Sequence, residues 1–466
     1  MRMPGPFPAS VALLCCTGTI AAQTIWQQIS ASGGPGRYGF GLAYDSSRDR
    51  VVAFGGLTST GFAADTWEFD GTTWRRATVT GPSPAPRGSP CLEFDATRGS
   101  VLLFGGGNPA ATAETWRWDG SRWTQLQPPA SPPARYYAQI AHDRARGRTV
   151  LYGGISAPAM NLFDTWEWDG TTWKQVQTTH TPSVAFAAGM TYDSRRGRVV
   201  LFGGGLPIGG FTDETWEYDG KDWTKAAPNP RPPAVSNPAM TYDVARQRVV
   251  VTSGASPTLG LQSDVWEWDG STWTRRQVPN PPAPRYAPEM VYDLARERCV
   301  FFGGTITSGS SGYEPGDTWS YEARWPASYT GYGSGCAGSA GVPELAAADG
   351  GRPWLGTTMR LELTRLAPAR ACILAFGASR TQWSGYVLPF DLTGLGMPGC
   401  ALLASLDVRY AGIADATGAA SHLLAVPIAR DLLGRPFYNQ VFGLDPAANA
   451  AGVVVSRGVS GIVGER

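Results

Sequence analysis

Four arginines recur at one position of a repeated sequence, and their side chains are well suited to binding an anion. Arg37, Arg87, Arg135 and Arg285 each precede a short apolar segment, whereas two other copies of the repeat carry Val184 and Val235 near that point. A guanidinium group offers forked donors that match a carboxylate. If the four side chains converge, they would form a partial ring that binds a carboxylate or an acidic sugar.

A structural role is the alternative for these arginines. Each repeat also has an acidic residue at the start of a later strand, and an arginine paired with it would join strands instead of facing a ligand. These acids are Asp65, Glu114, Asp164, Asp264 and Asp317.

Other ionisable residues also recur with the repeat. Six aspartates end a strand in DxxRxR turns, where an aspartate commonly accepts hydrogen bonds from its own backbone; they are Asp45, Asp95, Asp143, Asp193, Asp243 and Asp293. We expect a structural role for them, with calcium binding as the alternative. His142 takes the place of Tyr44 in its repeat and is expected to be packed, and His180 and His422 are the other histidines. We expect no metal and no cofactor, because metal-ligand spacings and nucleotide or hydrolase motifs are missing from the sequence.

The repeated unit is about fifty residues long and occurs six times, which is typical of stacked supersecondary units. A glycine doublet, replaced once by Ser-Gly, is followed by a tryptophan in DTWEWDG-like text; the tryptophans are Trp67, Trp116, Trp166, Trp216, Trp266 and Trp319. In the first copy the pattern predicts strands at 40–45, 50–54, 65–70 and 74–79. Four strands joined by tight turns are typical of one propeller blade.

The glycine doublets and spaced tryptophans resemble those of the kelch family over residues 25 to about 326. The resemblance implies a β-propeller, and six copies imply six blades. The tyrosine that usually follows the doublet in that family is absent or displaced here. Kelch-type copper oxidases need two histidines and two tyrosines that converge on the metal, and this sequence offers no such set.

The repeat also predicts how the domains are divided. Trp26 lies in text that matches the fourth strand of a repeat, so we expect residues 24–29 to supply the outer strand of the sixth blade. The whole is predicted to be all-β: a six-bladed kelch-type β-propeller at 23–327, followed by an antiparallel β-sandwich at 328–466. The second region resembles a module of secreted proteins from planctomycete-type bacteria, judged by GSGCAGSAGVPEL, LPFDLTGLGMPGC and LDPAANAAGVVVS. Its residues Gln440, Asp445 and Asn449 suggest a polar site or, as the alternative, turn and capping roles.

Residues 1–22 read as a signal peptide, with Arg2 followed by small apolar residues and Ala21-Ala22 before the expected cleavage site. Cys15 and Cys16 leave a lipoprotein as an alternative. We expect a secreted or cell-surface monomer without a membrane span, and the net charge of +1 argues against nucleic acid as a partner. Cys336 and Cys400, both in glycine-rich turn text, are predicted to form a disulfide. Cys91 and Cys299 are expected to be buried thiols, and the sequence does not assign a state to Cys372.

The expected function is non-catalytic recognition of an extracellular glycan or protein. The connections between second and third strands vary in length and chemistry, so we place binding on the face that bears them. Two alternatives stay open: a sugar-acid-active epimerase or lyase of the kelch-propeller type, and a structural cell-surface component.

Overall fold

The computed structural model describes residues 23–30, 33–158, 160–306, 315–324, 327–348 and 351–465. The expected signal peptide lies outside these residues. The chain divides into two compact units, Thr24–Ala323 and Arg324–Arg466. Both are built from antiparallel strands, which confirms the all-β class, and the helices in the described ranges are short 3-10 turns such as η2 (Thr393–Leu395) and η3 (Arg430–Leu432).

The first unit contains six four-stranded antiparallel sheets. The first five run outward in chain order. The first four of these are β2 (Gly41–Asp45), β3 (Arg50–Phe54), β6 (Thr66–Phe69) and β7 (Trp74–Arg76); β8 (Cys91–Asp95), β9 (Ser100–Phe104), β10 (Thr115–Trp118) and β11 (Trp123–Leu126); β12 (Gln139–Asp143), β13 (Arg148–Tyr152), β16 (Thr165–Trp168) and β17 (Trp173–Val176); and β18 (Gly189–Asp193), β19 (Arg198–Phe202), β20 (Thr215–Tyr218) and β21 (Trp223–Ala226).

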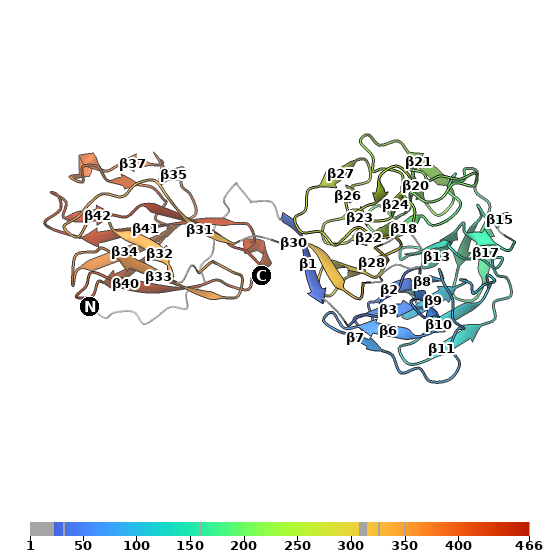
Figure 1. Ribbon diagram of the computed structural model, residues 1–466. Coiled ribbons are helices and arrows are strands. Elements are labelled where there is room, and N and C mark those ends of the chain that lie inside the picture. The colour runs from blue at the N-terminus through green and yellow to red at the C-terminus, as the bar shows by residue number, and fades with distance from the viewer. Residues whose placement is uncertain are drawn as a thin grey trace. The chain divides into compact units, whose positions relative to one another are not determined.

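In the fifth sheet the outer strand also follows the third strand along the chain, whereas in the sixth the outer strand is the first strand of the unit. The fifth is β22 (Ala239–Asp243), β23 (Arg248–Thr252), β26 (Val265–Trp268) and β27 (Trp273–Arg276). The sixth is β28 (Glu289–Asp293), β29 (Arg298–Phe302) and β30 (Thr318–Arg324), completed by β1 (Gln23–Ser30). The first and last strands of this unit are therefore hydrogen-bonded neighbours, as the blue β1 beside the yellow β30 shows (Figure 1).

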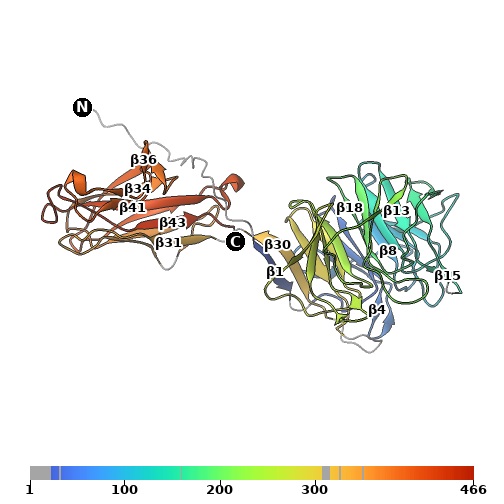
Figure 2. The same cartoon turned by 90° about the horizontal axis from the view of Figure 1, so that it is seen from above.

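The first strands of the six sheets contact one another in a closed order. β2 contacts β8, then the contacts run through β12, β18, β22 and β28, and β28 contacts β2 again. The sheets lie around these strands like blades, which gives the unit a propeller-like fold (Figures 1 and 2).

Tryptophan indoles connect neighbouring sheets. The fourth-strand tryptophan of one sheet donates from Nε1 to the hydroxyl of a threonine that begins the third strand of the preceding sheet. The pairs are Trp74–Thr318, Trp123–Thr66, Trp173–Thr115, Trp223–Thr165 and Trp273–Thr215, at 2.8–3.1 Å. The sixth such position has Trp26 facing a valine, Val265, and the buried Trp26 Nε1 has no hydrogen-bond partner.

A second set of contacts lies at the DxxRxR turns. Asp45 accepts hydrogen bonds from the backbone of Ser47 and Arg48, and the Arg48 guanidinium joins Asp45 to Glu68 at 2.7 Å each. Arg48 also lies against Gly120 of the next sheet, where φ is +101° and a Cβ atom would come within 2.7 Å of the guanidinium carbon. Glycine is required there both for the left-handed backbone and for the approach of the arginine.

The second unit has two main antiparallel sheets. One contains β31 (Ser328–Tyr332), β34 (Ala371–Gly377), β39 (Val408–Ile413), β41 (Pro436–Leu444), β42 (Val453–Val455) and β43 (Gly458–Ile462), and the other contains β32 (Glu344–Ala347), β33 (Thr358–Thr364) and β40 (Ala420–Ala425). Leu345 and Leu361 of the smaller sheet share one hydrophobic core with Leu374 and Val441 of the larger.

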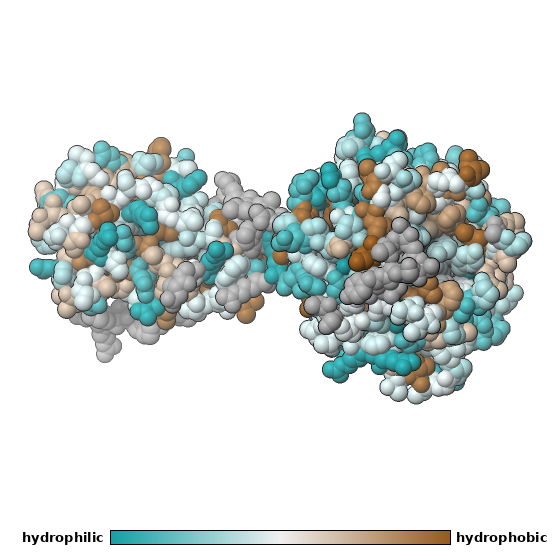
Figure 3. All heavy atoms as spheres, viewed as in Figure 1, coloured by the Kyte–Doolittle hydropathy of each residue, from teal (hydrophilic) through white to brown (hydrophobic). Residues whose placement is uncertain are grey.

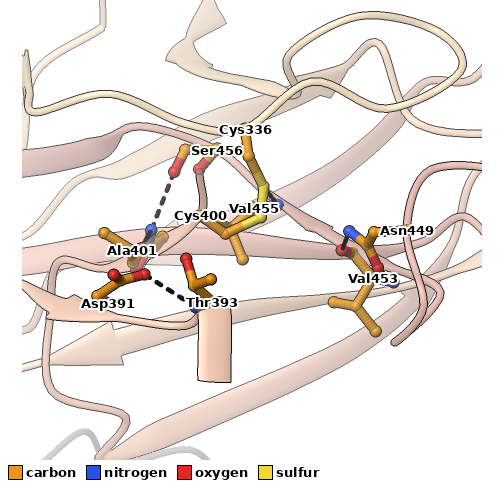
Figure 4. Close-up of a disulfide and its surroundings, with 10 residues drawn as sticks. Cys336, Asp391, Thr393, Cys400, Ala401, Asn449, Val453, Val455 and Ser456 are labelled. Carbon is orange, nitrogen blue, oxygen red and sulfur yellow. Dashed lines mark hydrogen bonds between the residues drawn. A yellow bond between two sulfur atoms is a disulfide. The ribbon is translucent and has the colours of Figure 1, made fainter. Parts of the chain in front are cut away.

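A disulfide joins Cys336 to Cys400 in this unit, which confirms the predicted pair (Figure 4). Both cysteines are buried beside Val455, so the bond joins two loops to the end of a sheet. Cys91, Cys299 and Cys372 are buried free thiols. Among the residues described, no helix has the length and apolar character that a membrane crossing requires.

Candidate functional site

The four arginines expected to face a ligand, here called the entry arginines, are each 1–2% exposed. Arg135 donates from Nη1 and Nη2 to the two carboxylate oxygens of Asp164 at 2.6 and 2.9 Å. Its Nη1 also donates to the Gly153 carbonyl and its Nε to the Pro133 carbonyl. Arg37 pairs in the same bidentate way with Asp65, and Arg285 with Asp317. Arg87 donates from Nη2 to Glu114 and from Nη1 to the Thr112 hydroxyl.

Each of these carboxylates also accepts a hydrogen bond from the tryptophan two residues later, as Asp164 does from Trp166 Nε1 at 2.7 Å. Burial alone would raise the pKa of Asp164, but the hydrogen bonds from Arg135 outweigh it and hold the pKa below its ordinary value. The guanidinium groups are therefore engaged inside their own sheets. This geometry favours the structural alternative over a ring of arginines around a ligand, because a buried, bidentate arginine has little donor capacity left.

The two sheets without an entry arginine use their acids differently. Glu214 accepts from Trp216 Nε1 and from Lys225, whereas Asp264 pairs with the exposed Arg275. The Trp266 indole consequently has no partner for its buried Nε1. The arginine–acid–tryptophan contact is thus a property of four sheets and not of the ring as a whole.

The six first strands enclose a cavity of about 180 Å³ along the centre of the unit. Its wall is layered by strand position. The first positions are Gly41, Cys91, Gln139, Gly189, Ala239 and Glu289; the second are the apolar Leu42, Leu92, Ile140, Met190, Met240 and Met290; and the third are Ala43, Glu93, Ala141, Thr191, Thr241 and Val291. The apolar second layer therefore lies between the first layer, which contains Gln139 and Glu289, and the third, which contains Glu93, Thr191 and Thr241. Ala141 and Ala239 belong to the pattern but do not line the cavity.

Glu289 and Glu93 are the two carboxyl groups of this wall. Burial raises the pKa of Glu289 to about 8. Among the described residues, no hydrogen bond or ion pair joins the Glu289 carboxyl group to another side chain, although its backbone pairs with β29. Burial also raises the pKa of Glu93, to about 7, against the opposing effects of Arg144 and of the Phe94 backbone N–H. Carboxyl groups that change charge near neutral pH in a cavity are suited to proton transfer or to pairing with a cation.

Sequence reasoning did not identify these glutamates. A signal was available, because Glu289 and Glu93 place an acid at strand positions where the other copies have small, apolar or uncharged side chains.

The end of the cavity at the first-position layer is bordered by residues with left-handed backbone. Gly39, Ser89, Tyr137, Ala187, Asn237 and Ala287 occupy one position in the six sheets, with φ of +49° to +58°. The residues just before them bridge to the variable connections, as Tyr38 does to Leu57 and Tyr286 to Thr305. This end of the cavity, here called the mouth, therefore opens on the side that bears the variable connections.

Aromatic side chains gather at the mouth. Tyr136 and Tyr137 pack edge to face at 5.3 Å, and Asn237 Nδ2 donates to the Tyr286 hydroxyl at 2.9 Å. Burial raises the pKa of Tyr286, and Tyr137 and Tyr38 are near enough to raise it further. Tyrosines from three different sheets thus lie close together at the entrance.

Among the residues that the structure describes, the exposed large hydrophobic side chains of the first unit lie on the same side. They are Phe62, Met160, Phe163, Ile208, Leu259 and Ile306, from 36% to 95% exposed, and all six belong to connections between second and third strands. We call this surface, together with the mouth, the loop face. In Figure 3 hydrophobic residues are interspersed with polar ones over the visible side of this unit.

The remaining candidates have structural partners. His142 is buried, with Nδ1 3.0 Å from Thr149 Oγ1 and Nε2 3.2 Å from Thr97 Oγ1, and burial lowers its pKa. His180 lies at the surface against Asp222, and His422 packs on Tyr410. The strand-end aspartates accept backbone and arginine hydrogen bonds, and the described ranges contain no group of three potential metal ligands.

The polar residues of the second unit also serve its fold. Gln440 is fully buried and bonds the Leu403 N–H and the Ala401 and Ser456 carbonyls at 2.9 Å. Asp445 accepts from Ser339, and Asn449 bonds Val453 across a turn (Figure 4). These contacts correspond to the turn and capping alternative.

Comparisons with known proteins give a fold similarity only. No protein-family model matches the chain. No curated protein matches it either. Among solved structures, that of YjhT aligns with 62% of this chain and 96% of its own, at 16% identity and a TM-score of 0.49.

Proposed function

We propose that this chain is a secreted, non-catalytic binding protein that recognises an extracellular polysaccharide or protein through the loop face. In this proposal the first unit is a six-bladed kelch-type propeller and the second a β-sandwich that acts as a spacer, anchor or second binding module. The observation that carries the proposal is that, within the described part of the first unit, all exposed large hydrophobic residues lie in the variable connections.

Such a distribution is unusual for a surface without a partner. Single exposed hydrophobic residues are ordinary, but a set gathered on one side and mixed with polar groups is typical of a binding surface. Tyrosine is well suited to such contacts because it combines a large apolar ring with a hydroxyl and loses little conformational entropy. The short turns at the opposite side, such as 70–73 and 219–222, carry polar residues bonded to their own backbone.

The test is binding of the full chain to a glycan panel and to extracellular proteins of its source. We expect a double variant, Phe62→Ser and Met160→Ser, to lose at least tenfold in affinity while the unfolding transition is unchanged. Lys221→Ser, an exposed substitution on a turn at the opposite side, is the matched control and should bind normally. Equal binding by the double variant and the control would refute recognition through the loop face.

A second candidate is a sugar-acid-active epimerase or lyase, and the cavity glutamates are the observation that favours it. A carboxyl group with a pKa near the working pH is an effective general acid or base. Turnover of uronic or sialic acids that is lost in both Glu93→Gln and Glu289→Gln, with binding retained, would support this candidate. Unchanged turnover in both variants would refute it.

A further inference from the structure

We infer that the mouth of the central cavity binds the protonated amino group of an amino sugar, with the carboxylate of Glu289 as its counter-ion. The inference rests on the polysaccharide form of the proposed function and names the chemistry of the sugar. It starts from the charges that line the cavity and from the side on which each one lies.

The wall of the cavity has more acidic side chains than basic ones: two glutamates and one arginine. Its ionisable side chains are Cys91, Glu93, Tyr137, His142, Arg144 and Glu289, together with the tyrosines at the strand ends (Tyr44, Tyr192, Tyr242 and Tyr292). The strand-end tyrosines and Cys91 are neutral at pH 7, because burial raises the pKa of Cys91 to about 12 and likewise raises the pKa values of Tyr44, Tyr192, Tyr242 and Tyr292. Burial keeps His142 neutral by lowering its pKa. Arg144 is the one cation of this wall among the described residues, and it acts on Glu93.

Glu289 is therefore the carboxyl group of this wall on which no positively charged side chain acts. Its carboxyl group lines the cavity, and Cys91, at the same strand position two sheets further on, is near enough to interact with it electrostatically. An ionised carboxylate in such a place is unfavourable until a cation joins it. A ligand that brings its own positive charge supplies that cation.

The layers of the wall determine from which side a ligand reaches each glutamate. Glu289 belongs to the first-position layer, next to the mouth, and Glu93 belongs to the third, beyond the apolar layer that contains Met240 and Met290. A ligand that enters from the loop face meets Glu289 first. Glu93 is consequently a matched control: a glutamate of the same cavity, on the other side of the apolar layer.

The mouth has the features expected of a sugar site. Tyr137, Tyr286 and Tyr38 offer aromatic rings near the entrance, and an ammonium group close to such rings gains a cation–π attraction in addition to the carboxylate. Gln139 and Asn237 line the same cavity and supply amide groups for hydroxyls. Small sites of this kind, apolar with a few placed polar groups, orient a ligand by those groups.

The experiment is calorimetric titration of the full chain at pH 7 with the trimer of glucosamine, its N-acetylated form and the trimer of glucose. We expect the amine-bearing trimer to bind and the other two to bind at least tenfold more weakly. Glu289→Gln should weaken the amine-bearing trimer by about thirtyfold or more, the range seen when one partner of an enclosed charge pair is removed. Glutamine already occupies this strand position in another sheet, at Gln139, so the variant is compatible with the fold.

Three results would overturn the inference: no binding of the amine-bearing trimer, equal binding of the N-acetylated form, or a loss in Glu93→Gln as large as in Glu289→Gln. Its failure is distinguishable from failure of the proposed function. Glycan binding that is lost in Phe62→Ser with Met160→Ser but retained in Glu289→Gln refutes only the amino-sugar site. Amine binding that depends on Glu289 but not on those loop residues refutes only recognition by the exposed loops.

Discussion

Replacing Val265 by threonine should stabilise the first unit, because it supplies the one missing member of a ring of hydrogen bonds. Five of the six sheets begin their third strand with a threonine that accepts from the tryptophan of the next sheet. Val265 occupies that position in the fifth sheet and leaves the buried Trp26 indole N–H unpaired. Valine and threonine have nearly the same shape, so the substitution changes chemistry and not packing.

The expected gain is the difference between two opposing contributions. Pairing an orphaned buried donor recovers about 1–3 kcal/mol. Exchanging a buried methyl group for a hydroxyl forfeits roughly 1 kcal/mol of hydrophobic stabilisation. The net stabilisation is therefore about 1 kcal/mol, which is about 2 °C in Tm for a unit of this size.

Urea unfolding followed by tryptophan fluorescence measures this change, with Trp26→Phe as the decisive background. In that background no indole N–H is present, so Val265→Thr should cost about 1 kcal/mol instead of adding stability. The reverse substitution, Thr165→Val, should destabilise by about 1–3 kcal/mol because it orphans the Trp223 indole. If Val265→Thr destabilises equally with and without Trp26, the hydrogen-bond explanation is wrong.

Three further predictions concern charge and covalent structure. Arg135→Met should destabilise by about 3 kcal/mol in urea unfolding because it leaves the Asp164 carboxylate enclosed without a cation, and Asp164→Asn in addition should restore part of the loss. Removing the Cys336–Cys400 disulfide, which closes 64 residues, should cost about 4 kcal/mol in the second unit, and a reducing agent should lower the Tm of the native chain in the same way. Burial raises the pKa of Glu289 to about 8, so its stabilising contribution is complete below about pH 4.5 and is lost as the pH rises to 8. Glu289→Gln should therefore leave the Tm unchanged at pH 4 and raise stability at pH 9 by about 2 kcal/mol, reduced from the full shift because the side chain keeps some contact with water; equal effects at both pH values would contradict this.

The strands of the first unit were predictable because the sequence pattern of each strand recurs in all six repeats. The glycine doublets end the second strands and the tryptophans lie in the third, so strands assigned in one repeat can be assigned at the same positions in the other five. The second unit has no repeat, and there the prediction was less accurate. The alternating sequence of residues 401–410 predicts one strand, but these residues form β38 (Ala401–Leu402) and the start of β39. The interruption follows from bonds to distant groups, such as Leu403 N–H to Gln440 Oε1 and Ser405 N–H to the Ser379 carbonyl.

The candidate site was harder to predict than the fold. The entry arginines were recognisable as a set, but whether they face a ligand or an acid depends on a distance between residues about thirty apart in the chain, such as Arg135 and Asp164. Glu289 and Glu93 share no motif and occur once each at their strand positions. Their importance comes from the closed ring of first strands, which makes one cavity wall from six separate segments.

The pairing of β1 with β30 has a consequence for the time course of folding. A hydrogen bond between Ser320 and the Gln27 carbonyl joins residues 293 apart, so β1 is made first and its partner last. At a synthesis rate of about 5–20 residues per second, β1 spends roughly 15–60 s without the strand it pairs with. During that interval the chain exposes unpaired strand edges, which can pair with other molecules. The ring of first strands closes earlier, since it needs only β28 to reach β2, so the cavity wall around Glu289 can exist before β1 gains its partner.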